Sequence, residues 1–247
     1  MAEKAPSAFG LRLNIWLLRI SRNWIRVVTV FLAIYVSLPV VAPTLMAAGL
    51  TGPGRALYTI YSPFCHQFGF RSFYLFGDQP VYPREIAGSD WTPYEAYTNE
   101  VDEFSSFSQN DEFTLDWTLA HKNYPGNDQM GYKTALCERD MFIYFALFIG
   151  AVLYSRPAVR RRLRPLPIWL YVILGVLPIA IDGFSQLLGY PPFELWAPRE
   201  TLPVFRVVTG FLFGIMTAWL GFPYINSAMQ DTQHEIEHKL RGRGIDV

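Results

Sequence analysis

The chain has 247 residues, of which 51% are hydrophobic and 16% aromatic, and its acidic and basic residues cancel to a formal charge of zero. The apolar residues are gathered in long blocks and do not recur at the spacing of amphipathic helices, which argues against a soluble globular domain. The neutral total also hides a segregation of charge along the chain, described below, that is typical of membrane topology.

Three blocks are long enough to cross a bilayer, which takes about 20 apolar residues. They cover residues 24–50, 166–190 and 204–225, and each contains one charged residue. A fourth block, residues 141–154, reaches this length only when it is extended back to residue 136. That extension places Cys137, Glu138, Arg139 and Asp140 in its first turns. We predict four transmembrane helices, the second over residues 136–155.

The distribution of Lys and Arg predicts the orientation. Residues 1–23 are basic and resemble a helix lying in the membrane interface, and the loop 156–165 holds five arginines and no acid. Residues 51–135 hold five basic and eleven acidic residues. We therefore expect a multi-pass protein of the plasma (inner) membrane with both termini cytoplasmic. The basic loop is explained by topology, so no nucleic-acid partner is expected.

The predicted fold is an all-α membrane protein with an N-terminal interfacial helix and an α-rich extracytoplasmic cap between the first two spans. Apolar residues at helical spacing in the cap suggest that it folds onto the outer face of the bundle. The predicted segments are the interfacial helix 1–23, the spans 24–50, 136–155, 166–190 and 204–225, the outer segment 51–135, the cytoplasmic loop 156–165, the outer loop 191–203 and the cytoplasmic tail 226–247.

Polar residues converge on the outer half of this bundle. They are Cys65, His66 and Arg71 after the first span, Cys137, Arg139 and Asp140 at the start of the second, Asp182 and Gln186 in the third, and Arg206 in the fourth. An ionisable residue inside a span usually faces the bundle interior and has a partner. The natural pairs are Asp182 with Arg206, and Asp140 with Arg139 or Arg71.

Four stretches, "CHQFGFRSFYLFG", "LCERD", "IDGFSQLLG" and "FRVVTGFLFG", resemble the motifs of a prokaryotic membrane family catalogued as domain of unknown function 2085. The resemblance covers mainly residues 62–77 and 136–214. It implies a multi-pass membrane protein and no established activity. Many members of that family carry a C-x-x-C pair at the second motif, where this chain has Cys137 and Asp140. Residues 81–134 have no counterpart in the family pattern.

The two cysteines allow three interpretations. Cys65, His66, Cys137 and Asp140 could together supply the ligands of a metal ion, and zinc accepts such a set. Alternatively, Cys65 and Cys137 form a disulfide on the outer side of the membrane, where the environment can be oxidising. In the third interpretation both remain free thiols buried in a polar network.

A second metal-like motif lies in the C-terminal tail. His234, Glu235 and His238 match H-E-x-x-H, the pattern of a zinc protease. The segment is charged and lies on the opposite side from the other cluster. Pairs of Glu235 with Lys239 and of Glu237 with Arg241 explain it as a solvated helix.

Two classes of function remain open, and the sequence does not say whether the protein is an enzyme. In the first, the protein has an outward-facing polar site in which Asp182 is the buried acid or base. In this version Arg71, Arg139 and Arg206 hold an anionic group such as a lipid phosphate, with His66 and Gln186 beside them. In the second, it is a non-catalytic membrane subunit whose ion pairs are structural and whose cap docks onto a protein partner. Gly210 and Gly214 are expected to pack closely against another helix in either case.

Overall fold

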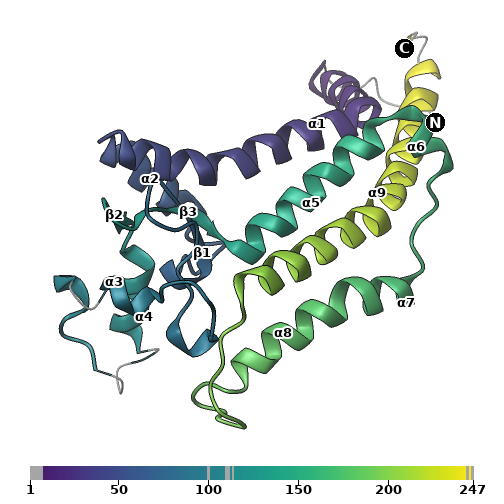
Figure 1. Ribbon diagram of the computed structural model, residues 1–247. Helices are drawn as coiled ribbons and strands as arrows, with labels where there is room; N and C mark the ends of the chain where they lie inside the picture. The colour runs from purple at the N-terminus through teal and green to yellow at the C-terminus, as the bar shows by residue number, and fades with distance from the viewer. Residues whose placement is uncertain (1–7, 99–100, 109–111, 113, 243–244, 246–247) are drawn as a thin grey trace.

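The computed structural model describes residues 8–98, 101–108, 112, 114–242 and 245, and it is mostly helical (Figure 1). The longer helices are α1 (Ala8–Ala47), α2 (Thr51–Tyr61), α4 (Leu115–Asn123), α5 (Glu138–Ser155), α8 (Leu177–Leu187) and α9 (Pro203–Arg241). The shorter ones are η1 (Gly69–Arg71), η2 (Glu85–Ala87), α3 (Tyr94–Thr98), η3 (Asp102–Phe104), α6 (Pro157–Arg162), α7 (Ile168–Tyr171) and the π-helical η5 (Val172–Val176).

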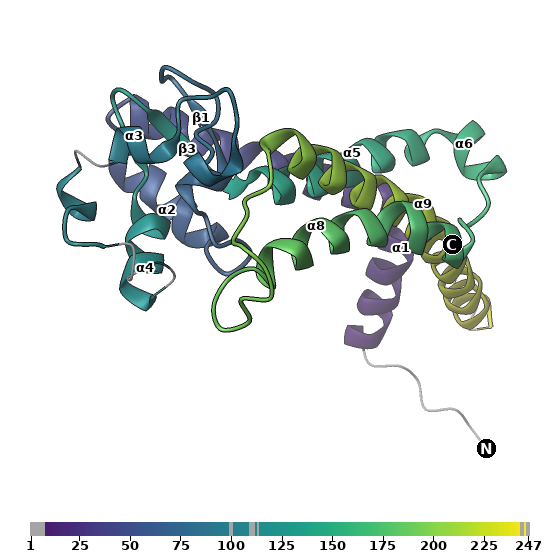
Figure 2. The same cartoon turned by 60° about the horizontal axis from the view of Figure 1, so that its bottom comes forward.

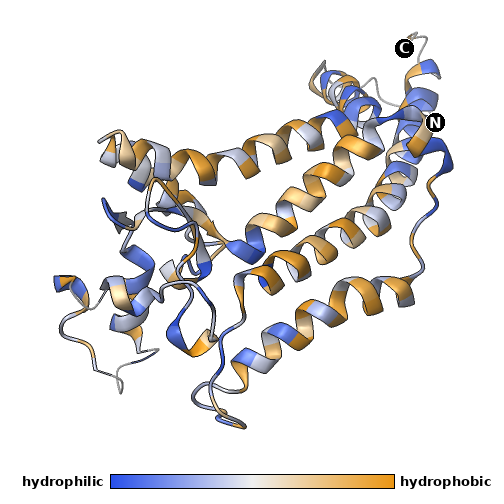
Figure 3. Cartoon of the chain, in the orientation of Figure 1, coloured by the Kyte–Doolittle hydropathy of each residue, from blue (hydrophilic) through white to orange (hydrophobic). Residues whose placement is uncertain are grey.

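Four long rods lie side by side in the order α1, α5, α9 and the continuous helix α7–η5–α8 (Figure 1). Hydrophobic residues cover the middle of these rods, and hydrophilic residues gather at their ends (Figure 3). The described residues of the segment 51–137 form a lobe, the cap, at one end of the helices, which we call the cap end. The other end, where the beginning of α1 meets the end of α9, is called the terminal end.

Among the described residues, three helices are long and apolar enough to cross a membrane: Phe9–Ala47, Ile168–Leu187 and Pro203–Arg241. The predicted span 136–155 is not among these three helices. Helix α5 has only 18 residues, and Glu138, Arg139 and Asp140 occupy its first turn. Its apolar part is therefore short, although it lies between α1 and α9.

Helix α1 contains a break at Asn23, where the backbone leaves helical geometry (φ −118°, ψ 15°). The turns before Asn23 run at an angle to the rest of the helix (Figure 2). They pack against the end of α9, where Leu18 contacts Ile236 and Leu240 in a buried cluster. The break coincides with the predicted boundary between the basic segment and the first span.

Helices α5 and α9 approach each other closely through small residues. A Cβ atom on Gly214 would lie 2.2 Å from the carbonyl oxygen of Ile143, and one on Gly210 would lie 2.5 Å from that of Arg139. Only glycine allows this backbone separation, as in other G-x-x-x-G contacts. The predicted packing role of Gly210 and Gly214 is confirmed.

The cap is not purely helical, so the expectation of an all-α fold is wrong. It contains an antiparallel sheet of β1 (Ser72–Leu75), β2 (Gly126–Asn127) and β3 (Gly131–Cys137), in the order β1-β3-β2. Strand β3 continues directly into α5, and Ser72 pairs with Cys137. Strands β1 and β2 are short, and β3 is almost entirely buried. None of the three therefore gives the alternating pattern that reveals a strand in sequence.

Aromatic residues form the core of the cap. They are Phe68, Phe70, Tyr74, Tyr82, Tyr94, Phe104, Trp117 and Tyr124, packed with Met130. Beside them Lys133 is 1% exposed, and its ammonium donates hydrogen bonds to the carbonyl oxygens of Gln67 (2.6 Å), His121 (3.1 Å) and Lys122 (2.8 Å). All three ammonium donors are thus satisfied, although burial lowers the pKa of Lys133 to about 7.

His121 lies inside this aromatic core and gives the cap a pH-dependent stability. Its ring stacks on Phe104, with centroids 4.4 Å apart, and its Nδ1 lies 3.3 Å from the Tyr94 hydroxyl. Burial, together with the positive charges of Arg84 and Lys133, lowers the pKa of His121 from 6.5 to about 3. The unfolded chain therefore binds a proton that the folded cap rejects between these two values.

We expect acidification from pH 7 to pH 5 to lower the free energy of unfolding by about 2 kcal/mol through this residue. Gln at position 121 can still accept a hydrogen bond from Tyr94 but does not titrate, so His121→Gln should flatten this part of the pH profile. Chemical denaturation followed by tryptophan fluorescence at several pH values measures the difference. If the free energy of unfolding depended equally on pH in the wild type and in His121→Gln, His121 would not be the titrating group.

Candidate functional site

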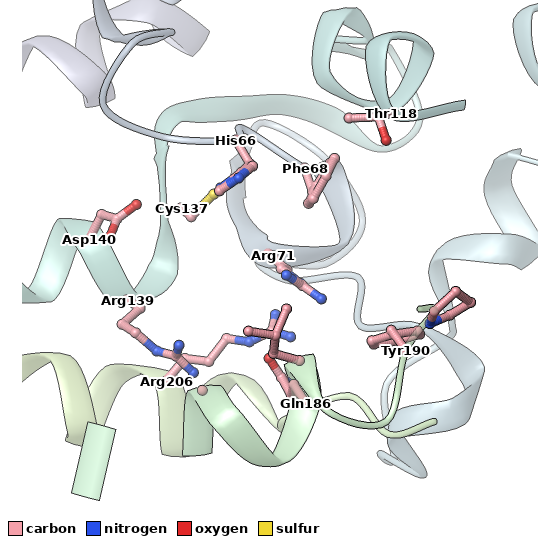
Figure 4. A pocket seen from close by; sticks show the side chains of 13 residues that line it. His66, Phe68, Arg71, Thr118, Cys137, Arg139, Asp140, Gln186, Tyr190 and Arg206 are labelled. Carbon is pink, nitrogen blue, oxygen red and sulfur yellow. The ribbon is translucent and has the colours of Figure 1, made fainter. Parts of the chain in front are cut away.

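A cavity of about 540 Å³, lined by several charged side chains among apolar ones, lies where the cap meets the ends of α5, α8 and α9. Figure 4 shows its lining side chains, which come from both the cap and the helices. They are His66, Phe68, Arg71, Thr118, Cys137, Arg139, Asp140, Gly183, Gln186, Leu187, Tyr190, Pro191 and Arg206. The structure therefore brings together, around one cavity, seven of the residues that the sequence placed in the outer half of the bundle.

Glu200 is the centre of the ion-pair network beneath this cavity. Its side chain is 1% exposed and forms ion pairs with Arg71 and Arg206. It also accepts hydrogen bonds from the Tyr190 hydroxyl (3.1 Å) and from Nε2 of Gln186 (3.4 Å). Burial alone would raise the pKa of Glu200, but the charges of Arg71 and Arg206 outweigh this effect and hold the pKa below 4.5.

Sequence reasoning missed Glu200 because it lies in the loop before α9, outside every apolar block. An acid in a polar loop is ordinarily solvated, and nothing in "PRETLP" distinguishes this one. The sequence indicates of Glu138 only that it is a charge in the first turns of the predicted span 136–155. The structure buries it to 1% exposure and places it 3.5 Å from Nη1 of Arg206.

The predicted pairing of Asp182 with Arg206 is wrong. Asp182 pairs with Arg139, lies 3.6 Å from Arg199, and accepts a hydrogen bond from the Thr201 hydroxyl at 2.6 Å. Arg206 instead turns toward the loop and pairs with Glu200. The loop 191–203 folds back over the helix ends at the cap end, and this brings Glu200 to Arg206.

The predicted pairing of Asp140 with Arg71 or Arg139 is also wrong, since Arg71 pairs with Glu200 and Arg139 with Asp182. Arg139 is nevertheless incompletely satisfied, because its buried Nε has no hydrogen-bond partner among the described residues. The acids Glu200 and Asp182 do not line the cavity, whereas Arg71, Arg139 and Arg206 do. The cavity wall therefore presents guanidinium groups with their counter-ions behind them.

Cys65, Cys137 and Asp140 meet at the edge of the cavity. One ligand atom from each lies within 4.8 Å of the other two, and this is the only such group of three His, Cys, Asp or Glu residues in the described part of the chain. Both cysteines are buried. Sγ of Cys65 also accepts hydrogen bonds from the backbone N–H groups of Gln67 (3.4 Å) and Cys137 (3.2 Å), which stabilise negative charge on sulfur.

His66, the fourth predicted metal ligand, does not join this group. Its exposed side chain lines the cavity and stacks on Phe68, with ring centroids 5.6 Å apart. Three of the four predicted ligands therefore converge, and the histidine lies beside them.

The separation of the two sulfur atoms is 2.7 Å. A disulfide would bring them to about 2.05 Å. Two thiolates bound to one tetrahedral zinc at about 2.3 Å would lie about 3.8 Å apart. A small movement of either side chain reaches each of these states, so the geometry is compatible with both.

The histidines of the C-terminal tail form no comparable group among the described residues. Glu235 pairs with Lys239 at 2.5 Å, while Glu237 pairs with Arg22 at 2.7 Å and lies 3.5 Å from Arg241. The interpretation of this motif as a charged helix is in accord with these contacts.

Comparison with known proteins agrees with the resemblance seen in the motifs. Residues 129–220 match the family model described as a predicted membrane protein (DUF2085). The matched segment is 92 of the 247 residues and agrees with the predicted resemblance. An uncharacterized protein of Methanocaldococcus jannaschii, MJ1492, is 27% identical over 133 residues, which are 53% of this chain and 79% of that protein. No solved structure matches the chain.

The DUF2085 match covers β3, α5, α8 and the first part of α9, and so contains Cys137, Asp140, Asp182 and Arg206. Cys65 and most of the cap lie outside it. With three apolar helices of bilayer length, the chain is a membrane protein in contact with lipid.

Proposed function

We propose that this DUF2085 protein crosses the plasma membrane four times, with α5 as the additional span, both termini cytoplasmic and the cap outside. Two observations support this topology. The beginning of α1 and the end of α9 meet at one end of the helices, as an even number of spans requires. The arginine-rich segment 156–164 lies at that same end, in accord with the positive-inside rule.

The function that the site supports best is recognition of an anionic group next to a bound metal ion. The observation that carries this proposal is the convergence of Arg71, Arg139 and Arg206 on the cavity whose edge is formed by Cys137 and Asp140. Planar guanidinium groups bind phosphate and carboxylate groups through paired hydrogen bonds. A phosphate group, such as that of a lipid head group, suits the charge and the position.

Zinc would be held by Cys65, Cys137 and Asp140, of which Cys137 and Asp140 also line the cavity. Zinc sites with three protein ligands usually bind a water molecule as well and acidify it. Such a site would favour hydrolysis of an ester bond, with His66 near enough to the cavity to exchange protons. Asp182 pairs with Arg139 and does not line the cavity, so we assign it a positioning role.

The test is the metal content of the detergent-purified protein, measured by inductively coupled plasma mass spectrometry. We expect about one zinc or other transition-metal ion per chain in the wild type. Cys65→Ser and Asp140→Ala should both lose it, because each removes one of three ligands. His66→Ala is the matched control, since its side chain lies outside the ligand group, and it should retain the metal.

A second candidate is a non-catalytic membrane subunit in which Cys65 and Cys137 form a disulfide. The 2.7 Å separation of their sulfur atoms is compatible with the metal site but is nearer to the length of a disulfide bond, about 2.05 Å. Leu115 and Leu119 are exposed one turn apart on α4, where a protein partner could dock on the cap. A wild-type protein without metal, and without free thiols under denaturing, non-reducing conditions, would exclude the metal site and support the disulfide.

A further inference from the structure

We propose that a second cavity, at the terminal end of the helices, binds the phosphate of an anionic phospholipid. This cavity of about 510 Å³ is formed where α1, α6 and α9 meet. It is separate from the cavity beneath the cap and uses none of its residues.

The cavity is built for an anion. Arg22, Arg160 and Arg161 line it together with three side-chain amides, those of Asn226, Gln230 and Gln233, and no carboxylate lines it. Within the described residues Arg160 and Arg161 form no ion pair, whereas Arg22 is held by Glu237 at 2.7 Å. Two guanidinium groups are therefore left to bind a ligand.

The amides are arranged so that N–H donors remain available. Asn226 accepts a hydrogen bond from Nε1 of Trp24 at 3.3 Å through its carbonyl oxygen, which leaves its NH₂ group free to donate. Gln230 has no hydrogen-bond partner among the described residues. Gln233 is already used, because its Nε2 donates to the carbonyl oxygen of Ser21 at 2.7 Å and thereby fixes the first part of α1 on α9.

The depth of the cavity identifies the source of the phosphate. Trp24, which lines the cavity, packs with Tyr154 and Phe222 in a buried cluster of the helix core, with ring centroids about 6 Å apart. The polar lining of the cavity therefore lies where the apolar core of the helices ends, which is the level of the polar head groups in a bilayer. The cavity thus opens at the level of the lipid phosphates, where basic pockets between transmembrane helices bind anionic head groups.

Membrane topology alone does not account for this arrangement. The loop also carries Arg162 and Arg164, which have the same effect on orientation but do not line the cavity. They provide a matched control, because removing either pair of arginines deletes the same charge from the same loop.

The experiment titrates short-chain phosphatidylglycerol into the full-length protein in a neutral detergent, with thermal stability and native mass spectrometry as readouts. We expect the melting temperature of the wild type to rise and the lipid to stay bound, and phosphatidylcholine to have neither effect. The double variant R160Q/R161Q should weaken apparent affinity about 30-fold, from the loss of two charges near the surface. R162Q/R164Q should match the wild type.

Gln230→Ala provides a variant without a change of charge, and it should also weaken binding. Equal weakening by the two double variants, or equal binding of phosphatidylcholine, would overturn the proposal, because either result would indicate diffuse attraction. A separate titration with inorganic phosphate tests whether the bound phosphate group belongs to a lipid. If phosphate alone stabilises the wild type as well as the lipid does, with the same loss in R160Q/R161Q, the lipid assignment is overturned and the cavity binds free phosphate.

Discussion

Replacing Glu200 by Gln is expected to lower the free energy of unfolding by about 3–5 kcal/mol, the usual cost of removing one partner from a buried ion pair. Gln has almost the same shape but no charge. Arg71 would then lack its carboxylate, and Arg206 would keep only Glu138, at 3.5 Å. Arg206, whose side chain is 3% exposed, would then be a buried charge with a single, longer ion pair. Denaturant titration in mixed micelles measures the change.

Glu194→Gln is the matched control, because Glu194 lies in the same loop and is exposed. It should leave stability nearly unchanged, since exposed charges contribute about 0–1 kcal/mol. An effect of Glu200→Gln no larger than that of Glu194→Gln would show that the network does not stabilise the fold. The cavity arginines would in that case be held by something other than Glu200.

Replacing Gly214 by Leu is expected to separate α5 from α9 and to cost about 3 kcal/mol, the upper end for overpacking a core. Even the first side-chain carbon would lie 2.2 Å from the backbone oxygen of Ile143 and 2.9 Å from Cβ of Ala146. The backbone atoms of α5 and α9 cannot move apart here unless one of the two helices shifts as a whole. The free energy of unfolding and the thermal midpoint in detergent both report the loss.

Gly221 lies on the same helix two turns further on, and a Cβ atom there would meet no atom within 4 Å. Gly221→Leu should therefore be tolerated. Equal destabilisation at both positions would point to a general intolerance of α9 and would contradict the close α5–α9 contact. Because α5 carries Arg139 and α9 carries Arg206, Gly214→Leu should also disturb the cavity beneath the cap.

Much of the candidate site could be predicted because its residues lie inside or beside apolar blocks. A charge such as Asp182 or Arg206 stands out in a stretch of this kind, and the physical cost of burying it implies a partner. The same reasoning fails for Glu200, which has no apolar surroundings in sequence. It becomes buried only when its loop folds over the helix ends.

The sheet and the core of the cap could not be predicted from the sequence either. Strand β1 has four residues and β2 has two, so neither carries a usable period. Lys133 reads as an ordinary surface lysine, although three backbone carbonyl groups from distant parts of the cap surround it. Contacts of this kind depend on chain segments that are brought together only by folding.

The sequence by itself determined the properties that depend on contiguous residues: the membrane-length blocks, the family motifs, the change of character near residue 23 and the close contact at Gly210 and Gly214. The tertiary structure decided which charges are partners. Arg71, Arg139 and Arg206 share one region with Glu138, Asp140, Asp182 and Glu200, and opposite charge alone permits many pairings among them. Distance selects among these pairings, and distance is set by how helices pack and loops return, which local chemistry does not encode.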